Sequence, residues 1–231
     1  MFKTFNFGTD EKSILISHLR IISKNYRIKG IGISSVVPVL NYPVKNHIRK
    51  YFKSVPLTIN NKTYLPVKIK VKNSNTLGSD RICNAAFGFE ENKSRSNVLI
   101  IDLGTANKYD LVLKSGEYIG GIIAPGLKVS AAALHSNTGK LPFLNIEKLS
   151  AKAPLIGKNT FEAIQSGLVN YMKAATEGIV KQVKTKYPGK LKIYLTGGSA
   201  KLIKNDLSFE FIYTENIVLR GINTILNYQN S

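Results

Sequence analysis

The chain has 231 residues, of which 43% are hydrophobic and 20% are charged. This composition is ordinary for a folded protein and excludes general disorder, and the length suits one large domain or two small ones. No apolar run approaches the roughly 18 residues that a membrane span needs. The first ten residues lack the apolar core of a signal peptide, so we expect a cytoplasmic protein with no membrane partner.

The net charge of +19 would attract polyanions, which makes nucleic acid the first partner to consider. However, only six of the 33 basic residues are arginines, and the lysines are spread from Lys3 to Lys204 rather than gathered into a stripe. We therefore do not expect nucleic-acid binding, and expect instead a field that favours anionic substrates.

Hydrophobic periodicity predicts helices and strands in alternation over the first part of the chain. Residues 10–24 follow a helical period, and residues 30–38 are typical of a strand that runs into a small-residue loop. Residues 43–53 are typical of a short basic helix, and residues 64–71 hold one or two strands.

A further helix is predicted over residues 79–92, with Ser79 as its N-cap. Cys83, the single cysteine, has apolar neighbours at helical spacing, which indicates a buried apolar side chain rather than a nucleophile. One cysteine also excludes an internal disulfide and a multi-cysteine metal site. The polar run at residues 92–97 marks a boundary between two domains.

The stretch from Val98 to Ala106 carries the strongest single signal in the sequence. Four residues typical of a buried strand precede Asp102, and Gly104 and Thr105 follow it. Glycine lets a backbone approach a ligand closely, so the carboxylate and the hydroxyl could face a cation or a polyphosphate. A strand that ends in Asp-x-Gly is also an ordinary turn, and this segment alone leaves both interpretations open.

The rest of the chain continues the alternation of strands and helices. The predicted elements are a hairpin over 109–123, a helix to about 136, a loop over 138–158, a helix over 159–186 capped by Asn159, a strand over 190–195 that ends in Thr196-Gly197-Gly198, a strand over 209–213 and a helix over 216–228.

Five motifs of this sequence follow one another in the order and spacing of one known family. They are Leu77-Gly78-Ser79-Asp80-Arg81, Asp102-Leu103-Gly104-Thr105-Ala106, Gly120-Gly121-Ile122-Ile123-Ala124-Pro125-Gly126, Gly157-Lys158-Asn159-Thr160 and Thr196-Gly197-Gly198. Together they resemble the type III pantothenate kinases, also called the Bvg accessory factor family. The resemblance runs from about Thr9 to Gly198.

The resemblance implies an α/β fold of the actin-like ATPase type, shared with acetate and sugar kinases, made of two ribonuclease-H-like halves. We expect the halves at residues 1–96, incomplete at the N-terminus, and at residues 97–231. The implied reaction is phosphorylation of pantothenate to 4'-phosphopantothenate by ATP, the first step of coenzyme A biosynthesis. The implied requirements are a divalent cation such as Mg²⁺, a monovalent cation (K⁺ or NH₄⁺) and a homodimer.

The resemblance also implies a role for individual residues. Asp80 resembles the general base, Gly78, Ser79 and Arg81 the rest of the pantothenate-binding turn, Asp102 the ligand of the monovalent cation, Thr105 an ATP contact and Thr160 a further substrate contact. These residue types suit the chemistry, because phosphoryl transfer needs a carboxylate to accept the hydroxyl proton and an arginine can hold a carboxylate with two donors. The structural alternatives are a helix-start acid for Asp80, a surface ion pair for Arg81 and part of a helix cap for Thr160.

The sequence departs from the family pattern in two respects. Members normally begin with a strand and an Asp-x-Gly-Asn-Thr phosphate loop, and no such motif precedes Thr9. Asn107 and Lys108 stand where hydroxyl residues are usual, and Val71 and Ser74 replace a tyrosine and a proline.

These departures lead to two expectations. Either the recorded start lies inside a longer gene product, or the chain is a degenerate member, and we expect little or no kinase activity from these 231 residues alone. The alternative function is that of a catalytically impaired homologue, which binds a ligand or acts as a regulatory protein.

Overall fold

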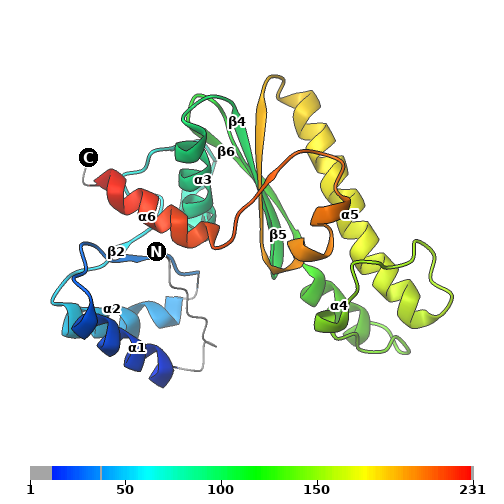
Figure 1. Ribbon diagram of the computed structural model, residues 1–231, viewed down its shortest axis with the longest axis horizontal. Helices are drawn as coiled ribbons and strands as arrows, with labels where there is room; N and C mark the ends of the chain where they lie inside the picture. Colours follow the sequence, from blue (N-terminus) through cyan, green and yellow to red (C-terminus); the bar gives the residue numbers. More distant parts are fainter. Residues whose placement is uncertain (1–11, 37, 230–231) are drawn as a thin grey trace.

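The computed structural model describes residues 12–36 and 38–229, and it has an α/β architecture built around a six-stranded sheet (Figure 1). The strand order is β3-β6-β5-β4-β7-β8. The strands are β3 (Lys68–Ile69), β4 (Asn97–Leu103), β5 (Ala106–Val112), β6 (Glu117–Pro125), β7 (Leu191–Thr196) and β8 (Ile212–Tyr213). The predicted α/β class is confirmed.

Three of the strands form an antiparallel meander, β4-β5-β6, and β7 and β8 run parallel to β4. This order and these directions are the ones expected of a ribonuclease-H-like half. Strand β3 lies before residue 96 but joins the same sheet, parallel to β6. Both sides of the predicted boundary therefore contribute to the large sheet, and the division at residues 96 and 97 stays a prediction.

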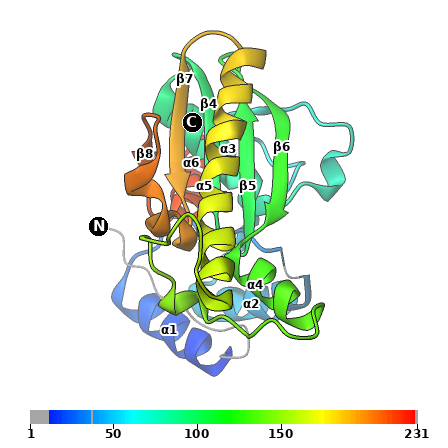
Figure 2. The same ribbon diagram turned by 90° about the vertical axis from the view of Figure 1, so that its right-hand side faces the viewer.

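Helices cover both faces of this sheet. Helices α3 and α6 pack together on one face, and α5 runs along the other (Figures 1 and 2). The helices are α1 (Lys12–Asn25), α2 (Pro38–Phe52), α3 (Ser79–Asn92), α4 (Leu127–Ser136), α5 (Thr160–Lys186) and α6 (Ile217–Gln229). None of the helices in the described part of the chain is long and apolar enough to span a bilayer.

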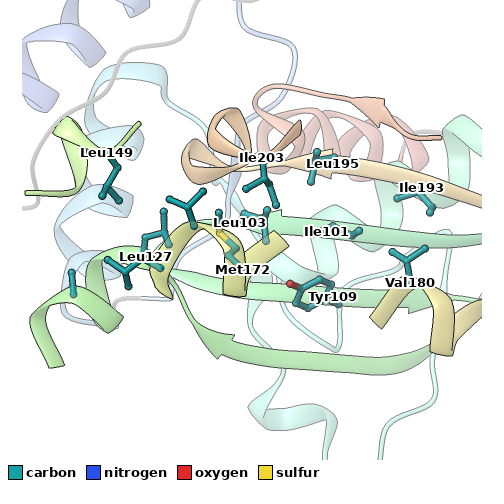
Figure 3. Close-up of a cluster of buried hydrophobic side chains, with 14 of the residues drawn as sticks. Ile101, Leu103, Tyr109, Leu127, Leu149, Met172, Val180, Ile193, Leu195 and Ile203 are labelled. Atoms are coloured by element: carbon teal, nitrogen blue, oxygen red, sulfur yellow. The ribbon is translucent and has the colours of Figure 1, made fainter. Parts of the chain in front are cut away.

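The alternation of side chains along the strands explains why both faces are covered. On the α3 face, Val98 and Ile100 of β4 pack in a buried cluster with Ala85 and Phe87. On the α5 face, the intervening residues of β4 belong to a larger cluster with Tyr109 and the helices α4 and α5 (Figure 3). A strand buried on both faces reads as a continuous apolar run, as residues 98–101 do.

A smaller unit lies beside the large sheet. Strands β1 (Gly32–Ile33) and β2 (Leu57–Thr58) pair in parallel, and helices α1 and α2 pack on each other. The strand expected within residues 30–38, ahead of a small-residue loop, is limited to Gly32–Ile33, and helix α2 begins at Pro38. The predicted helix start at residue 43 is wrong, since Pro43 lies inside the helix.

Other short elements complete the fold. Four 3₁₀ turns occupy Ser74–Thr76, Ile146–Lys148, Gly198–Leu202 and Lys204–Asp206. The cap predicted for α5 is confirmed, because the Asn159 carbonyl Oδ1 accepts the backbone N–H of Glu162 at 2.9 Å. The cap predicted for α3 is wrong: Gly78 is the N-cap and Ser79 is the first helical residue.

Candidate active site

The start of helix α3 faces the charged side chains of β4 and β5. In the strand register Asp102 lies opposite Lys108, and both are an even number of residues from positions that face α3. Asp110 follows two residues after Lys108 and is fully buried on the same face. Period-two alternation thus directs three charges towards the first turn of α3, which carries Asp80 and Arg81.

Lys108 bridges two carboxylates. Its Nζ lies 2.7 Å from Asp80 Oδ2 and 3.0 Å from Asp102 Oδ2, and all three side chains are at most a quarter exposed. Burial alone would lower the pKa of Lys108, but the hydrogen bonds and charges of Asp80 and Asp102 outweigh it and raise that pKa above its ordinary value. Lys108 is therefore held in its charged form, and its ammonium group lies between Asp80 and Asp102.

Arg81 makes a second ion pair, deeper in the molecule. Its Nη2 and Nε lie 2.6 and 2.8 Å from Asp110 Oδ1, which also accepts the Tyr118 hydroxyl at 2.6 Å. Burial raises the pKa of Asp110, and the pairing with Arg81 acts in the opposite direction. For Arg81, burial would lower the pKa, but the contacts with Asp110 raise it. Arg81 thus binds Asp110 through two of its nitrogens, Nη2 and Nε.

The turn before α3 depends on glycine and on a serine pair. A Cβ on Gly78 would lie 2.5 Å from Asp80 Oδ1, so a larger residue would displace that carboxylate. Ser79 Oγ accepts a hydrogen bond from Ser34 Oγ at 2.9 Å, which ties the turn to the segment after β1. Asp80 Oδ1 also accepts the Arg81 backbone N–H at 2.9 Å, as a helix-start acid does.

Three glycine turns meet at the end of the sheet where β4 finishes. Gly104 and Thr105 connect β4 to β5, and the Gly126 amide donates to the Thr105 carbonyl at 3.0 Å. Gly197 has φ +97°, and a Cβ there would collide with the Leu103 backbone. Such turns leave backbone groups open to a phosphate, and Thr105 itself is exposed.

Five of the seven predicted site residues are brought together in this way: Gly78, Ser79, Asp80, Arg81 and Asp102. Thr105 lies on the adjoining turn. Thr160 is the first residue of α5, on the helix that covers the other face of the sheet, and it is not part of the ion-pair cluster of the described residues.

Two partners escaped the sequence-based prediction of the site, Asp110 and Tyr118. The sequence contains a signal for Asp110, because Lys108 and Asp110 are charged residues that alternate with apolar ones on a buried strand. A charge at such a position is paired or functional, although the sequence does not say with which group.

The fold and the site define a class of protein, the phosphotransferases. These enzymes act mainly by positioning their substrates and neutralising charge, and this site offers a carboxylate, two fixed cations and glycine turns in one place. The family model described as "Type III pantothenate kinase" matches residues 4–182. The chain belongs to this family, whose reaction is the ATP-dependent phosphorylation of pantothenate in coenzyme A biosynthesis.

A named relative supports the same assignment. The chain is 37% identical over 195 residues to the type III pantothenate kinase of Sulfurihydrogenibium sp. (strain YO3AOP1). The aligned region covers 84% of this chain and 75% of the relative.

Solved structures give more distant likenesses. A 15-stranded ParM filament from Clostridium botulinum matches with a TM-score of 0.46 at 13% identity, over 99% of this chain and 76% of that chain. A glucokinase from Parabacteroides distasonis matches with a TM-score of 0.40 at 12% identity, over 96% of this chain and 69% of that chain.

Proposed function

We propose that the cluster at the start of α3 is the pantothenate site of this chain, and that Asp80 accepts the proton of the pantothenate hydroxyl during phosphorylation. The observation that carries the proposal is the position of the Asp80 carboxylate. It lies at a helix start beside the Asp102–Lys108 pair and the glycine turns that end β4 and β7. This reaction needs a carboxylate that can accept the hydroxyl proton, and it needs that carboxylate close to the bound ATP phosphates.

The other predicted residues take supporting roles. Gly78 and Ser79 shape the turn that receives pantothenate, and Arg81 offers Nη1 to its carboxylate while Asp110 holds the guanidinium in place. Thr105 contributes its exposed hydroxyl to ATP beside the glycine turns.

The described residues fit a divalent cation of the kind that ATP brings with it. They contain no group of three or more histidine, cysteine, aspartate or glutamate side chains placed to hold a metal. Mg²⁺ does not need one, because it keeps several waters and binds through phosphates with one or two carboxylates. Asp80 and Asp102 are both paired with Lys108, so the ion would be held mainly by the ATP phosphates, whose charge it would neutralise.

The same residues do not fit a free monovalent cation at Asp102. Asp102 Oδ2 lies 3.0 Å from Lys108 Nζ, whose ammonium already brings one positive charge to that place. We therefore assign no step to K⁺ or NH₄⁺.

The proposal includes a cytoplasmic homodimer. Helix α5, which begins at Thr160, covers the face of the sheet opposite to α3, so we infer that Thr160 holds substrate in the site of a second copy. Large apolar side chains near it are exposed and available for such a contact: Leu155, Ile156, Phe161 and Tyr171.

A coupled assay of ADP formation tests the proposal. We expect pantothenate-dependent ADP formation that Asp80→Asn lowers by at least about 100-fold, since general-base catalysis contributes about 10²- to 10⁴-fold. Asp206→Asn removes an exposed carboxylate from a remote turn, and this control variant should keep the wild-type rate. Equal rates for wild type and Asp80→Asn would contradict the proposed role of Asp80.

One observation favours the second candidate, a catalytically impaired homologue. Asp80 Oδ2 is already in an ion pair with Lys108, so the proton acceptor is partly occupied. Calorimetry with pantothenate separates the two candidates: binding without turnover supports the impaired homologue, whereas binding with turnover supports the kinase. The departures of the sequence from the family pattern led to the opposite expectation, little or no activity from these 231 residues, and the same assay decides between the two: turnover by the wild type would show that expectation to be wrong.

A further inference from the structure

The ammonium group of Lys108 occupies the place at which a free cation would contact Asp102. We propose that Lys108 is a built-in cation, which replaces a free monovalent cation in this site and makes the chain independent of K⁺ and NH₄⁺. This inference rests on the proposed function only for its catalytic consequence, because the binding of a cation is measurable without substrate.

The contacts of Lys108 are those of a site-bound ammonium. Its Nζ carries one positive charge and three donors, of which two are directed to Asp80 and Asp102 at 2.7 and 3.0 Å. The third donor is left for a ligand. An ammonium ion bound to the same two carboxylates would present the same charge, with one more N–H donor in place of the bond to the lysine side chain.

The strand register explains why this cation is always present. Asp102 and Lys108 are directly paired across β4 and β5, in the part of the sheet that leads into the Gly104–Thr105 turn. The Lys108 side chain is only 16% exposed, so it is held by its surroundings as well as by its partners. A free ion must be recruited from solution, whereas this one is attached to the sheet.

Charge makes a second cation unfavourable. The two carboxylates already share one ammonium, and a monovalent ion at Asp102 would lie within a few ångströms of Nζ. Like charges at that separation repel each other, most strongly where burial reduces screening by water. Lys108 and a free ion are therefore alternatives, and removal of the lysine should open the site to the ion.

The test compares the complete chain in potassium chloride and in choline chloride at equal ionic strength, because choline is too large for the site. Two readouts are used: the thermal unfolding midpoint without substrate, and the rate of pantothenate-dependent ADP formation. The variants are Lys108→Thr and the matched control Lys114→Thr, which removes an exposed lysine from the β5–β6 turn.

We expect the wild type and Lys114→Thr to have the same midpoint and rate in both salts. Lys108→Thr should lose about 10- to 100-fold in rate in choline, the loss typical when a group that supports a cation site is removed. Potassium or ammonium should restore that rate and raise the midpoint of this variant, since an ion that binds only the folded state stabilises it.

Two results would overturn the inference: a wild-type midpoint or rate that requires potassium, or a Lys108→Thr variant that responds to potassium no more than Lys114→Thr does. If Lys108→Thr does not fold, calorimetric titration of the wild type with thallium(I), a potassium mimic, decides the question, and binding would overturn the inference. Absence of wild-type turnover in every salt would contradict the proposed function instead, while the midpoints would still decide the role of Lys108.

Discussion

Arg81 and Asp110 are the most buried of the ion pairs in the described residues, and they connect the site to the stability of the fold. Asp110 is fully buried, and its Oδ1 accepts from both Arg81 and Tyr118. Removal of the carboxylate would leave the guanidinium largely buried without its partner. The free-energy cost of that unpaired charge exceeds the net stabilisation that the intact pair provides.

We therefore predict that Asp110→Ala lowers the free energy of unfolding by about 3–5 kcal/mol in urea denaturation, the range for breaking a buried pair. The control is Glu215→Ala, which removes an exposed partner of Lys201 at 3.9 Å and should cost less than about 1 kcal/mol. Similar losses for both variants would show that burial of the Arg81–Asp110 pair has no energetic consequence.

The Cys83 thiol supports a second prediction at the scale of one residue. Burial raises its pKa to about 12, so the nucleophilic thiolate is nearly absent at neutral pH. We expect no labelling of the native protein by iodoacetamide at about pH 8, and full labelling after unfolding in urea, measured by mass spectrometry. Rapid labelling of the folded protein would contradict this account of Cys83.

The raised pKa also fixes the sign of a pH effect. The pKa of the thiol is near its ordinary value of 9.0 in the unfolded chain and about 12 in the folded one, so the stability contributed by the neutral buried thiol is present below pH 9 and is lost as the pH rises towards 12.

The sequence contained much of the site, and its limits have a physical cause. The positions of Asp80, Arg81 and Asp102 follow from local motifs, and the structure places them in one cluster. The ion pairs of Lys108 with Asp80 and of Asp110 with Arg81 depend on how α3 packs on β5. The paired residues are 28 and 29 positions apart in the sequence. Local patterns give the face on which a side chain lies, but not its partner across the core.

At the scale of elements, the packing of α3 on α6 requires a close approach of the two backbones. Gly221 of α6 lies against Cys83 of α3, and a Cβ on Gly221 would collide with the Cys83 backbone. A side chain there must push apart two helices that cover one face of the sheet, so we expect strain rather than a local adjustment.

We predict that Gly221→Ala destabilises the chain by about 1–3 kcal/mol, as overpacking does, with a lower thermal midpoint in calorimetry. Gly167 of α5 is the matched control, because nothing lies within 4 Å of its would-be Cβ. Gly167→Ala should be neutral or stabilise by up to about 1 kcal/mol, since alanine favours helix. Equal effects of the two substitutions would contradict the assigned packing.

Long periodic segments were predicted best at this scale. The helices over 79–92 and 159–186 occur within a residue of their predicted bounds, because their apolar faces are local features, although the cap of the first is Gly78 and not the predicted Ser79. Short strands were predicted worst: of the strand and small-residue loop expected over 30–38, only Gly32–Ile33 is a strand. Such strands are defined by the partner with which they pair, and the sequence of one strand does not contain that information.

At the scale of the whole molecule, the proposed dimer rests on exposed apolar residues just before α5 and along its first half. Leu155 and Ile156 are 78% and 79% exposed, and Tyr171 is 76% exposed. An apolar surface of this kind is typical of a contact between proteins.

We predict that the wild type has the mass of two chains in light scattering coupled to gel filtration, and that Ile156→Lys has the mass of one. Val55 is a suitable control, since it is also exposed, at 73%, but lies near β2. Val55→Lys should remain a dimer. A monomeric wild type would contradict the proposed dimer and, with it, the route by which Thr160 reaches the substrate.

The account as a whole places catalysis at Asp80 and a permanent cation at Lys108, and one measurement addresses both claims. It is the rate of pantothenate-dependent ADP formation in choline chloride, without potassium or ammonium, for the wild type and for Asp80→Asn. The account predicts turnover by the wild type and a loss of at least about 100-fold in the variant. Equal rates for the two proteins, or turnover by the wild type only after potassium is added, would contradict it.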